Sequence, residues 1–269
     1  MKSLIVTADD YGMSTAIDAG IVDLIAQGRV SATSCMTLSP RWPQAATCLT
    51  PAVRQRAHLG LHLDLTEFAT PRWPLGRLIL TAYAGGLDVA ALRQTLSDQL
   101  DRFESALGQT PHYVDGHQHV HQLPQVRQVL VEVLMQRYAP GRRPWLRISD
   151  AGVAQGWKGV LIARLGSGAL RRLARRHGLL TTDRLLGVYD FQGDADRYLQ
   201  RLRRWLLHVA GPAQGHEPGG TALMCHPAAH LDPADPLGAA RHAEYLALRS
   251  EGFAALLAKA HLRVVPGPA

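Results

Sequence analysis

Short apolar runs alternate along the chain with longer segments in which apolar residues recur every three or four positions. The short runs predict buried strands, and the longer segments predict amphipathic helices. The predicted strands lie in residues 4–12, 30–38, 58–65, 112–115, 145–149, 221–226 and 262–265. The predicted helices lie in residues 17–25, 42–48, 89–107, 124–138, 164–177, 194–209 and 241–260.

Local signals mark some of these boundaries. Ser14 is a good N-cap for the first helix, and Gly28 suits its C-terminal end. Residues 67–86 contain Pro71, Pro74 and three glycines. Because proline and glycine are frequent in turns, this stretch is predicted to be a long loop with little regular structure.

The alternation of strands and helices predicts the fold class. It is typical of an α/β protein whose mostly parallel sheet is connected by helical crossovers. The sequence shows no composition break, low-complexity segment or repeat of fixed period, so we expect one domain over residues 1–269. Polar residues recur at the ends of several predicted strands, which favours a barrel over an open sheet.

Composition narrows the class of protein. Hydrophobic residues make up 46% and charged residues 19% of the chain, as expected for a soluble globular protein. No run of about 18 apolar residues exists, so no membrane span is expected. The first apolar run ends in acids, unlike a secretory signal. The three cysteines are far apart, which predicts buried thiols in a reducing compartment and therefore a cytoplasmic protein.

The chain is basic, with a formal net charge of +7 and a pI of about 9.7. Such a charge favours acidic partners in general, whether nucleic acid, anionic lipid or an anionic substrate. No nucleic-acid-binding motif is present, so no nucleic-acid partner is expected. The basic residues are concentrated between positions 164 and 184, and their number need not describe an active site.

Two adjacent carboxylates, Asp9 and Asp10, follow the first apolar run and precede Tyr11 and Gly12. Neighbouring carboxylates repel, and one tends to keep a proton unless a cation or a good donor lies nearby. No basic residue occurs among the next ten positions, so a bound metal ion is the simplest way to keep both ionised. The alternative is an ordinary strand-to-helix turn, where Asp is common.

The densest cluster of possible metal ligands is Asp115, His117, His119 and His121. In a strand these alternate residues face the same side, so the four side chains could converge on a divalent metal. The alternative is a polar loop with solvated histidines. His62 and His226 each lie at the end of a predicted strand, and each alone is weak evidence of a functional site.

Four motifs together resemble the YdjC-like (ChbG/HpnK) carbohydrate deacetylases. They are Thr7-Ala-Asp-Asp-Tyr-Gly12, Gly60-Leu-His62, Val114-Asp-Gly-His-Gln-His-Val-His121 and Leu223-Met-Cys-His-Pro227. The resemblance implies a distorted (β/α), TIM-like barrel and one divalent metal ion, Mg²⁺ or Zn²⁺. It also implies removal of an N-acetyl group from an amino sugar or sugar conjugate, such as an oligosaccharide or a glycolipid.

The same resemblance implies roles for individual residues. Asp10, His62 and His117 would be the metal ligands, Asp9 the catalytic base and His226 the general acid. Five more residues are expected behind the ligands or against the substrate: Asp115, His119, His121, Tyr11 and Trp73. Of these, Asp115 suits the task of orienting a ligand histidine, and Trp73 suits stacking on a sugar or partly buried packing.

The predicted chemistry is sound without the family. Amide hydrolysis needs a better nucleophile than neutral water, and a metal held by one carboxylate and two imidazoles lowers the pKa of bound water. Asp9 can accept that water's proton, and His226 can protonate the leaving amine. The same ligand set could serve a metal-dependent hydrolase of a phosphoester or a cyclic amide.

A different class of function is suggested by the basic helical segment 164–177. Its arginines are interleaved with leucines, so it could dock on anionic lipid as a membrane-surface protein or be an ordinary solvated face. Peripheral contact with an anionic membrane would make a lipid-linked sugar the attractive substrate. Residues 150–195 match no motif, and a homodimer is expected.

Overall fold

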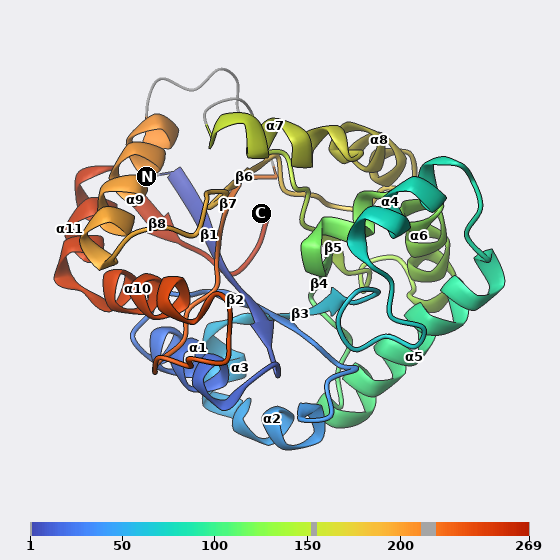
Figure 1. Ribbon diagram of the computed structural model, residues 1–269, viewed down its shortest axis with the longest axis horizontal. Coiled ribbons are helices and arrows are strands. Elements are labelled where there is room, and N and C mark those ends of the chain that lie inside the picture. The colour runs from blue at the N-terminus through green and yellow to red at the C-terminus, as the bar shows by residue number, and fades with distance from the viewer. Residues whose placement is uncertain (1, 152–154, 211–218, 269) are drawn as a thin grey trace.

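The computed structural model describes residues 2–151, 155–210 and 219–268, and its centre is a curved sheet of parallel strands (Figure 1). The strands are β1 (Lys2–Tyr11), β2 (Ala32–Cys35), β3 (His58–Leu63), β4 (Tyr113–Gly116), β5 (Trp145–Leu146), β6 (Arg184–Leu186), β7 (Thr221–Cys225) and β8 (Leu262–Val264).

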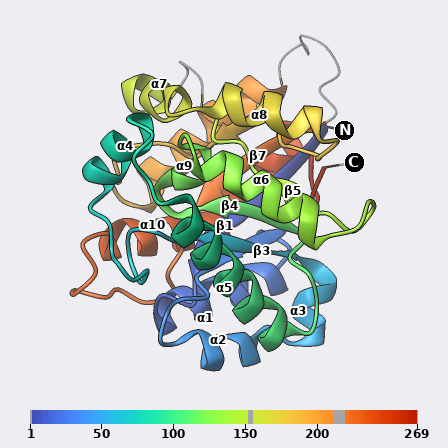
Figure 2. The same ribbon diagram turned by 90° about the vertical axis from the view of Figure 1, so that its right-hand side faces the viewer.

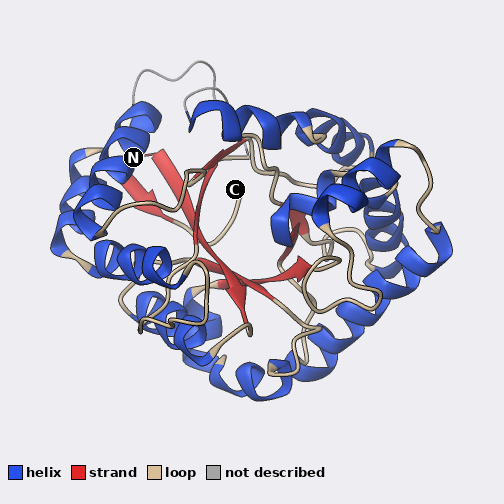
Figure 3. Ribbon diagram, in the orientation of Figure 1, coloured by secondary structure: helices blue, strands red, loops and turns tan. Residues whose placement is uncertain are grey.

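Helices surround the strands on all sides, as Figure 3 shows. They are α1 (Thr15–Ala26), α2 (Trp42–Cys48), α3 (Pro51–Arg56), α4 (Leu75–Tyr83), α5 (Val89–Leu107), α6 (Val126–Arg137), α7 (Gly156–Arg164), α8 (Ser167–Arg176), α9 (Ala195–Ala210), α10 (Gly238–Arg249) and α11 (Glu251–Lys259), with a short 3₁₀ helix, η1 (His117–Gln122). None of the described helices combines the length and the apolar character that a membrane span requires.

The strand order around the sheet is β5-β4-β3-β2-β1-β7-β6, and β8 pairs with the start of β1. The two ends of this order meet at a seam. There Leu146 forms a single parallel bridge with Thr181, and the Leu185 N–H donates to the carbonyl of Asp150. The sheet is therefore a distorted barrel, and among the described residues few backbone hydrogen bonds cross this junction.

The core lies between the strands and the helices. β1 is buried from Leu4 to Tyr11, as its apolar run predicts for a strand covered on both faces. One large apolar cluster packs β1 and β7 against α1, α9 and α10, and a second packs β3 and β4 against α5 and α6. The carboxyl ends of all these parallel strands therefore open at the same end of the barrel.

Several predicted elements have the observed boundaries. α2 and α5 begin and end where the periodicity places them, and the Ser14 hydroxyl accepts from the Ile17 N–H at the start of α1. The long loop predicted for residues 67–86 is wrong, because α4 occupies its middle. Leu78 and Ala82 are buried on one face of that helix, and this packing outweighs the nearby prolines and glycines.

Two predicted helices differ from the observed ones. Most of the basic segment 164–177 is α8, but its first residue, Arg164, ends α7, because Gly166 has a φ of 129° that lies outside helical geometry. The segment 241–260 is divided at Ser250, whose hydroxyl accepts from the Phe253 N–H and caps α11. α4 lies near the junction of α7 and α8 (Figure 2). The Tyr83 hydroxyl, at the end of α4, donates to the Arg164 carbonyl.

Candidate metal-binding and catalytic site

The two carboxylates at the end of β1 face the same side because the strand is irregular there. Successive residues of a regular strand face opposite sides. The pairing of β1 with β2 shifts register between Ala8 and Tyr11, and Asp10 has a left-handed φ of 69°. Asp tolerates this conformation better than most residues do. As a result, Asp9 Oδ2 and Asp10 Oδ1 lie 3.9 and 3.5 Å from the same nitrogen, His62 Nε2.

The turn after Asp10 is held by side chains from two other elements. Asp18, on α1, accepts the Gly12 N–H at 2.6 Å, and the Ser39 hydroxyl donates to the Gly12 carbonyl at 2.7 Å. Arg41 pairs with the second oxygen of Asp18 at 3.1 Å. The unusual backbone at Asp10 is therefore fixed by its surroundings, as strained functional residues require.

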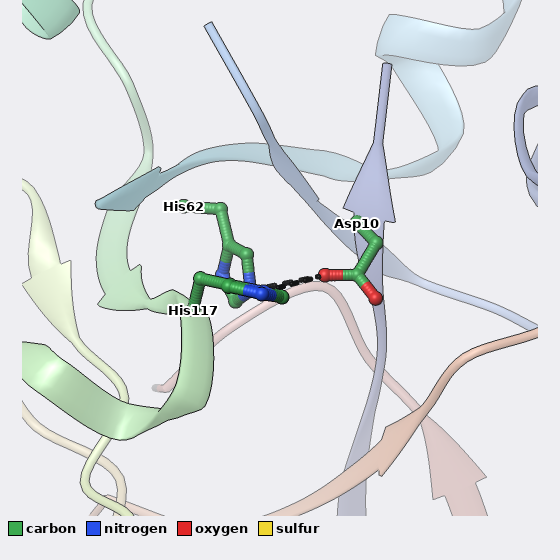
Figure 4. Close-up of side chains that lie close together, drawn as sticks. All are labelled: Asp10, His62 and His117. Atoms are coloured by element: carbon green, nitrogen blue, oxygen red, sulfur yellow. Dashed lines mark hydrogen bonds and ion pairs between the residues drawn. The ribbon is translucent and has the colours of Figure 1, made fainter. Parts of the chain in front are cut away.

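Three possible metal ligands converge at this point, as Figure 4 shows. Asp10 Oδ1 lies 3.0 Å from His117 Nδ1 and 3.5 Å from His62 Nε2. One oxygen or nitrogen atom from each residue lies within 4.8 Å of the other two. A carboxylate oxygen with two imidazole nitrogens is a usual donor set for a divalent metal that keeps positions open for water and substrate. The residues therefore fit a divalent cation.

His62 is oriented by Asp115 from the neighbouring strand β4. Asp115 Oδ1 lies 2.6 Å from His62 Nδ1, and the Ser34 hydroxyl donates to Asp115 Oδ2 at 2.6 Å. Burial alone would lower the pKa of His62, but Asp115 and Asp9 outweigh it and raise this pKa to about 10. An imidazole whose Nδ1 faces a carboxylate presents Nε2 to the cluster, which is the usual arrangement behind a metal-bound histidine.

Arg147 is a site residue that sequence reasoning missed. It follows β5, is completely buried, and donates to both oxygens of Asp9 at 2.6 Å. Its Nε lies 2.9 Å from Asp115 Oδ2, so one guanidinium joins the two carboxylates. Burial would lower the pKa of Arg147, but the two carboxylates raise it. The only sequence signal was a basic residue directly after a short apolar strand.

Arg241, on α10, is the second missed residue. Its Nη2 donates to Asp10 Oδ2 at 2.8 Å, and its Nε lies 2.8 Å from Asp235. Burial would raise the pKa of Asp10, but Arg241 and His117 lower it well below its usual value. A bound metal is therefore not the sole source of positive charge at the adjacent carboxylates, because two arginines distant in sequence also contact them.

The strand predicted for residues 112–115 is confirmed as β4, but the strand does not continue through the histidines. The segment forms the 3₁₀ helix η1, in which Gln118 and His119 have left-handed φ angles of 52° and 61°. Only His117 reaches Asp10. His119 Nδ1 lies 2.9 Å from the Ser149 hydroxyl, and His121 Nε2 donates to the Arg147 carbonyl at 2.9 Å. These two histidines therefore support the segment that carries Arg147 and do not join the cluster.

His226 directly follows β7. Its backbone N–H donates to Glu244 Oε2 at 2.5 Å, and its ring meets Phe191 edge-on with centroids 5.3 Å apart. Burial lowers the pKa of His226, but the carboxylate of Glu244 raises it overall, with smaller contributions from Asp10 and Asp9. A protonated imidazole is thus favoured beside the candidate metal site.

The family described as YdjC-like protein matches residues 3–259, which is nearly the whole chain. The chain belongs to the YdjC-like family.

Individual relatives agree with this membership. The YdjC-like chain is 34% identical to the carbohydrate deacetylase of Mus musculus over 251 residues, which are 83% of this chain and 77% of the relative. It is 33% identical to that of Homo sapiens over 69% of this chain and 62% of the relative. A chitooligosaccharide deacetylase of Yersinia pestis is 34% identical over 52% of this chain and 59% of its own length.

Solved structures confirm the distorted barrel of this YdjC-like chain. A protein of Enterococcus faecalis V583, whose name refers to cellobiose-phosphate cleavage, has a TM-score of 0.71 at 20% identity. That match covers 98% of this chain and 97% of the other. The Bc1960 peptidoglycan N-acetylglucosamine deacetylase has a TM-score of 0.51 at 13% identity, over 98% and 85% of the two chains. At these identities the likeness shows the fold alone.

Two residues that were expected behind the ligands or against the substrate of this YdjC-like chain have packing contacts. Tyr11 is completely buried in the core, and its hydroxyl donates to the Ala45 carbonyl at 2.8 Å. Trp73 is half-buried against the apolar cluster around β3 and β4, with the Arg77 guanidinium 5.7 Å from its ring centroid. The structure brings together Asp9, Asp10, His62, Asp115 and His117, and places Tyr11 and Trp73 in packing environments.

Proposed function

We propose that this protein is a metal-dependent hydrolase that removes the N-acetyl group from an amino sugar or a sugar conjugate. The observation that carries the proposal is the convergence of Asp10, His62 and His117 from three distant segments. Relatives named carbohydrate deacetylase and chitooligosaccharide deacetylase support the same reaction and an N-acetylated sugar as substrate.

The three convergent residues would hold one divalent cation, Mg²⁺ or Zn²⁺. Such a cation would polarise the acetyl carbonyl and lower the pKa of water. Asp115 would keep the His62 ring in place through its 2.6 Å contact with Nδ1. Arg241 would hold the second oxygen of Asp10, so that the first oxygen remains directed at the two histidines.

Asp9 is the proposed catalytic base. Arg147 occupies one hydrogen-bonding direction of each Asp9 oxygen. A carboxylate oxygen has a second such direction, so Asp9 can still accept a proton from water. The guanidinium also fixes the carboxylate plane, and a positioned base contributes about 10²–10⁴-fold to such reactions.

His226 is the proposed general acid. Water loses a proton to Asp9 while its oxygen bonds to the acetyl carbon. When the C–N bond then breaks, the nitrogen takes the bonding electron pair and receives a proton from His226. The products are acetate and the free amine, and the two side chains regain their starting protonation states by exchange with solvent.

Acetate release from N-acetylated oligosaccharides and glycolipids tests the proposal. Metal-stripped protein should release none, and adding Mg²⁺ or Zn²⁺ should restore release. His62→Gln should remain inactive with either metal. Hydrolysis of a phosphoester or cyclic amide, with no acetate from any N-acetyl sugar, would instead support the competing hydrolase.

We further propose that the substrate is a glycolipid and that the protein reaches it by contact with an anionic membrane. α8 exposes Arg172, Arg175 and Arg176, whereas Arg171 is paired with Asp150. The neighbouring α4 exposes Leu80, which is 74% accessible. Exposed arginines beside apolar side chains favour contact with anionic lipid.

Flotation with anionic and neutral liposomes tests the membrane contact. We expect binding to the anionic vesicles that Arg172→Glu with Arg175→Glu abolishes, and equal flotation with both vesicle types would contradict it. The expected homodimer is checked separately by light scattering, where a monomer mass at working concentrations would exclude it.

A further inference from the structure

Helix α10 brings two charged side chains to the site, one helical turn apart. Arg241 contacts Asp10, on the carboxylate side of the site. Glu244, three residues later, contacts His226 and is completely buried. A buried carboxylate is costly unless its oxygens are satisfied, so its partners indicate what it does.

Both oxygens of Glu244 have defined partners. Oε2 accepts the backbone N–H of His226 at 2.5 Å, and Oε1 accepts the Tyr189 hydroxyl at 2.7 Å. Oε1 also lies 3.9 Å from His226 Nδ1. That nitrogen is buried and has no hydrogen-bond partner among the described residues. A small rotation of the ring would bring Nδ1 within hydrogen-bonding reach of Oε1.

We propose that Glu244 is a positioning residue for His226, holding its backbone and the Nδ1 edge of its ring so that Nε2 is directed at the leaving nitrogen. This inference rests on the proposed deacetylase function, in which His226 is the general acid. A histidine with one ring nitrogen fixed by a carboxylate has a defined tautomer and a defined free nitrogen. Phe191, edge-on to the ring with centroids 5.3 Å apart, restricts it from another side.

The charged surroundings of His226 distinguish Glu244 from the other carboxylates. His226 faces Glu244 from α10, Asp9 and Asp10 from β1, and His119 from η1. Asp9 and Asp10 are paired with arginines, whereas Glu244 has a hydrogen bond to His226 itself. Replacing Glu244 therefore removes the main group that raises the pKa of His226.

The first test compares an amide with an activated ester in Glu244→Gln. Amide cleavage needs a protonated leaving nitrogen, whereas 4-nitrophenyl acetate has a leaving group that needs no acid. We expect deacetylation of an N-acetyl sugar to fall by about 10²-fold and ester cleavage to stay within about twofold of the wild type. The alkaline limb of the amide pH profile should move to lower pH. Equal losses on both substrates, or no loss on either, would overturn the inference.

Glu251→Gln is the matched control, because its side chain on α11 is 93% exposed and pairs with Arg29 at the surface. It should leave both rates and the pH profile unchanged. In the His226→Ala background, Glu244→Gln should cause no further loss on the amide, because a residue that acts through His226 has nothing left to position. A further tenfold loss there would contradict the assignment.

A measurement without catalysis separates this inference from the proposed function. In histidine-labelled protein, the NMR titration of the His226 ring should move to lower pH in Glu244→Gln. If the wild type releases no acetate but this shift occurs, the proposed function fails and the positioning by Glu244 stands. An unchanged titration refutes the positioning whatever the activity. If Glu244→Gln does not fold, Tyr189→Phe frees Oε1 and should move the titration to higher pH; no movement would count against Glu244.

Discussion

Strand β3 carries a histidine at each end, and the two lie in opposite electrostatic environments. His62, near the carboxyl end, meets Asp115 and Asp9, which raise its pKa to about 10 despite its burial. His58, at the amino end, stacks on His112 with ring centroids 4.3 Å apart. Burial and the neighbouring imidazole lower the pKa of His58 to about 4. Burial acts in the same direction on both rings, so the partners supplied by adjacent strands decide the outcome.

The two ends of the barrel differ in the same way as these two histidines. At the amino end, Tyr113 and Trp145 stack with ring centroids 4.3 Å apart, and the Trp145 indole N–H lies 3.4 Å from His58 Nδ1. At the carboxyl end, carboxylates, imidazoles and guanidinium groups share a small buried volume. The amino end therefore stabilises the fold by packing, and the carboxyl end holds the candidate functional site, as expected of parallel barrels.

The same substitution at both ends gives the largest contrast. His62→Gln should abolish acetate release and lower metal affinity by more than about 10²-fold, because a first ligand costs more than the groups behind it. His58→Gln should retain metal and activity. Metal content by mass spectrometry and acetate assays measure both. Comparable activity in the two variants would remove the distinction between the ends.

Arg147→Met tests how strongly the charged end depends on ion pairing. Removing the guanidinium leaves Asp9 and Asp115 buried without their partner, which should destabilise the fold by about 3–5 kcal/mol. Urea unfolding at neutral pH measures the loss. Arg172→Met, at an exposed arginine of α8, is the control and should change stability by about 0.5 kcal/mol or less. A similar small change in Arg147→Met would show that the carboxylates need no buried cation.

Asp115→Asn tests the group behind His62 and should have a smaller effect. The amide keeps the size of the side chain but loses the charge that holds Nδ1–H, so metal affinity should fall by about 10–100-fold. Isothermal titration with Zn²⁺ measures the affinity. Wild-type affinity in this variant would mean that the ring is held by packing alone.

His58 should make stability depend on pH in a narrow window. Its pKa is about 4 in the folded protein and close to 6.5 when unfolded, so the unfolded chain binds more protons between these values. The neutral ring's contribution is complete above about pH 6.5 and is lost as pH falls towards 4. Because the ring is partly exposed, we expect about 1 kcal/mol between pH 7 and pH 4.5. His58→Gln should reduce the drop in unfolding free energy, measured by urea titration at the two pH values, by that amount; an identical drop would exclude His58.

Periodicity predicted the alternating strands and helices because burial of one face leaves a repeat in the sequence. It predicted α5 with its exact range, but it missed α4, where only Leu78 and Ala82 are buried. The candidate metal ligands Asp10, His62 and His117 were predicted from the motifs that carry the family resemblance. Their convergence depends on the left-handed backbone at Asp10, and no hydrophobic pattern encodes such a turn.

The arginines were missed for a different reason. Arg147 and Arg241 have the same residue type as the many solvated arginines of the chain, and only the fold shows that they are buried against Asp9 and Asp10. The alternation of Asp115, His117, His119 and His121 suggested four side chains on one face of a strand, which the structure does not contain. It has the period of a strand, yet the segment turns into a 3₁₀ helix after Gly116.

The seam of the barrel has a consequence for how ligand binding is communicated through the fold. Leu146, which forms the single bridge to Thr181, directly precedes the arginine that clamps Asp9. Local opening of that junction would therefore withdraw the clamp, and occupancy of the site would resist the opening. The Thr182 amide, which donates to the Leu146 carbonyl at 3.1 Å, thus becomes a reporter: its deuterium uptake should slow when the site is filled.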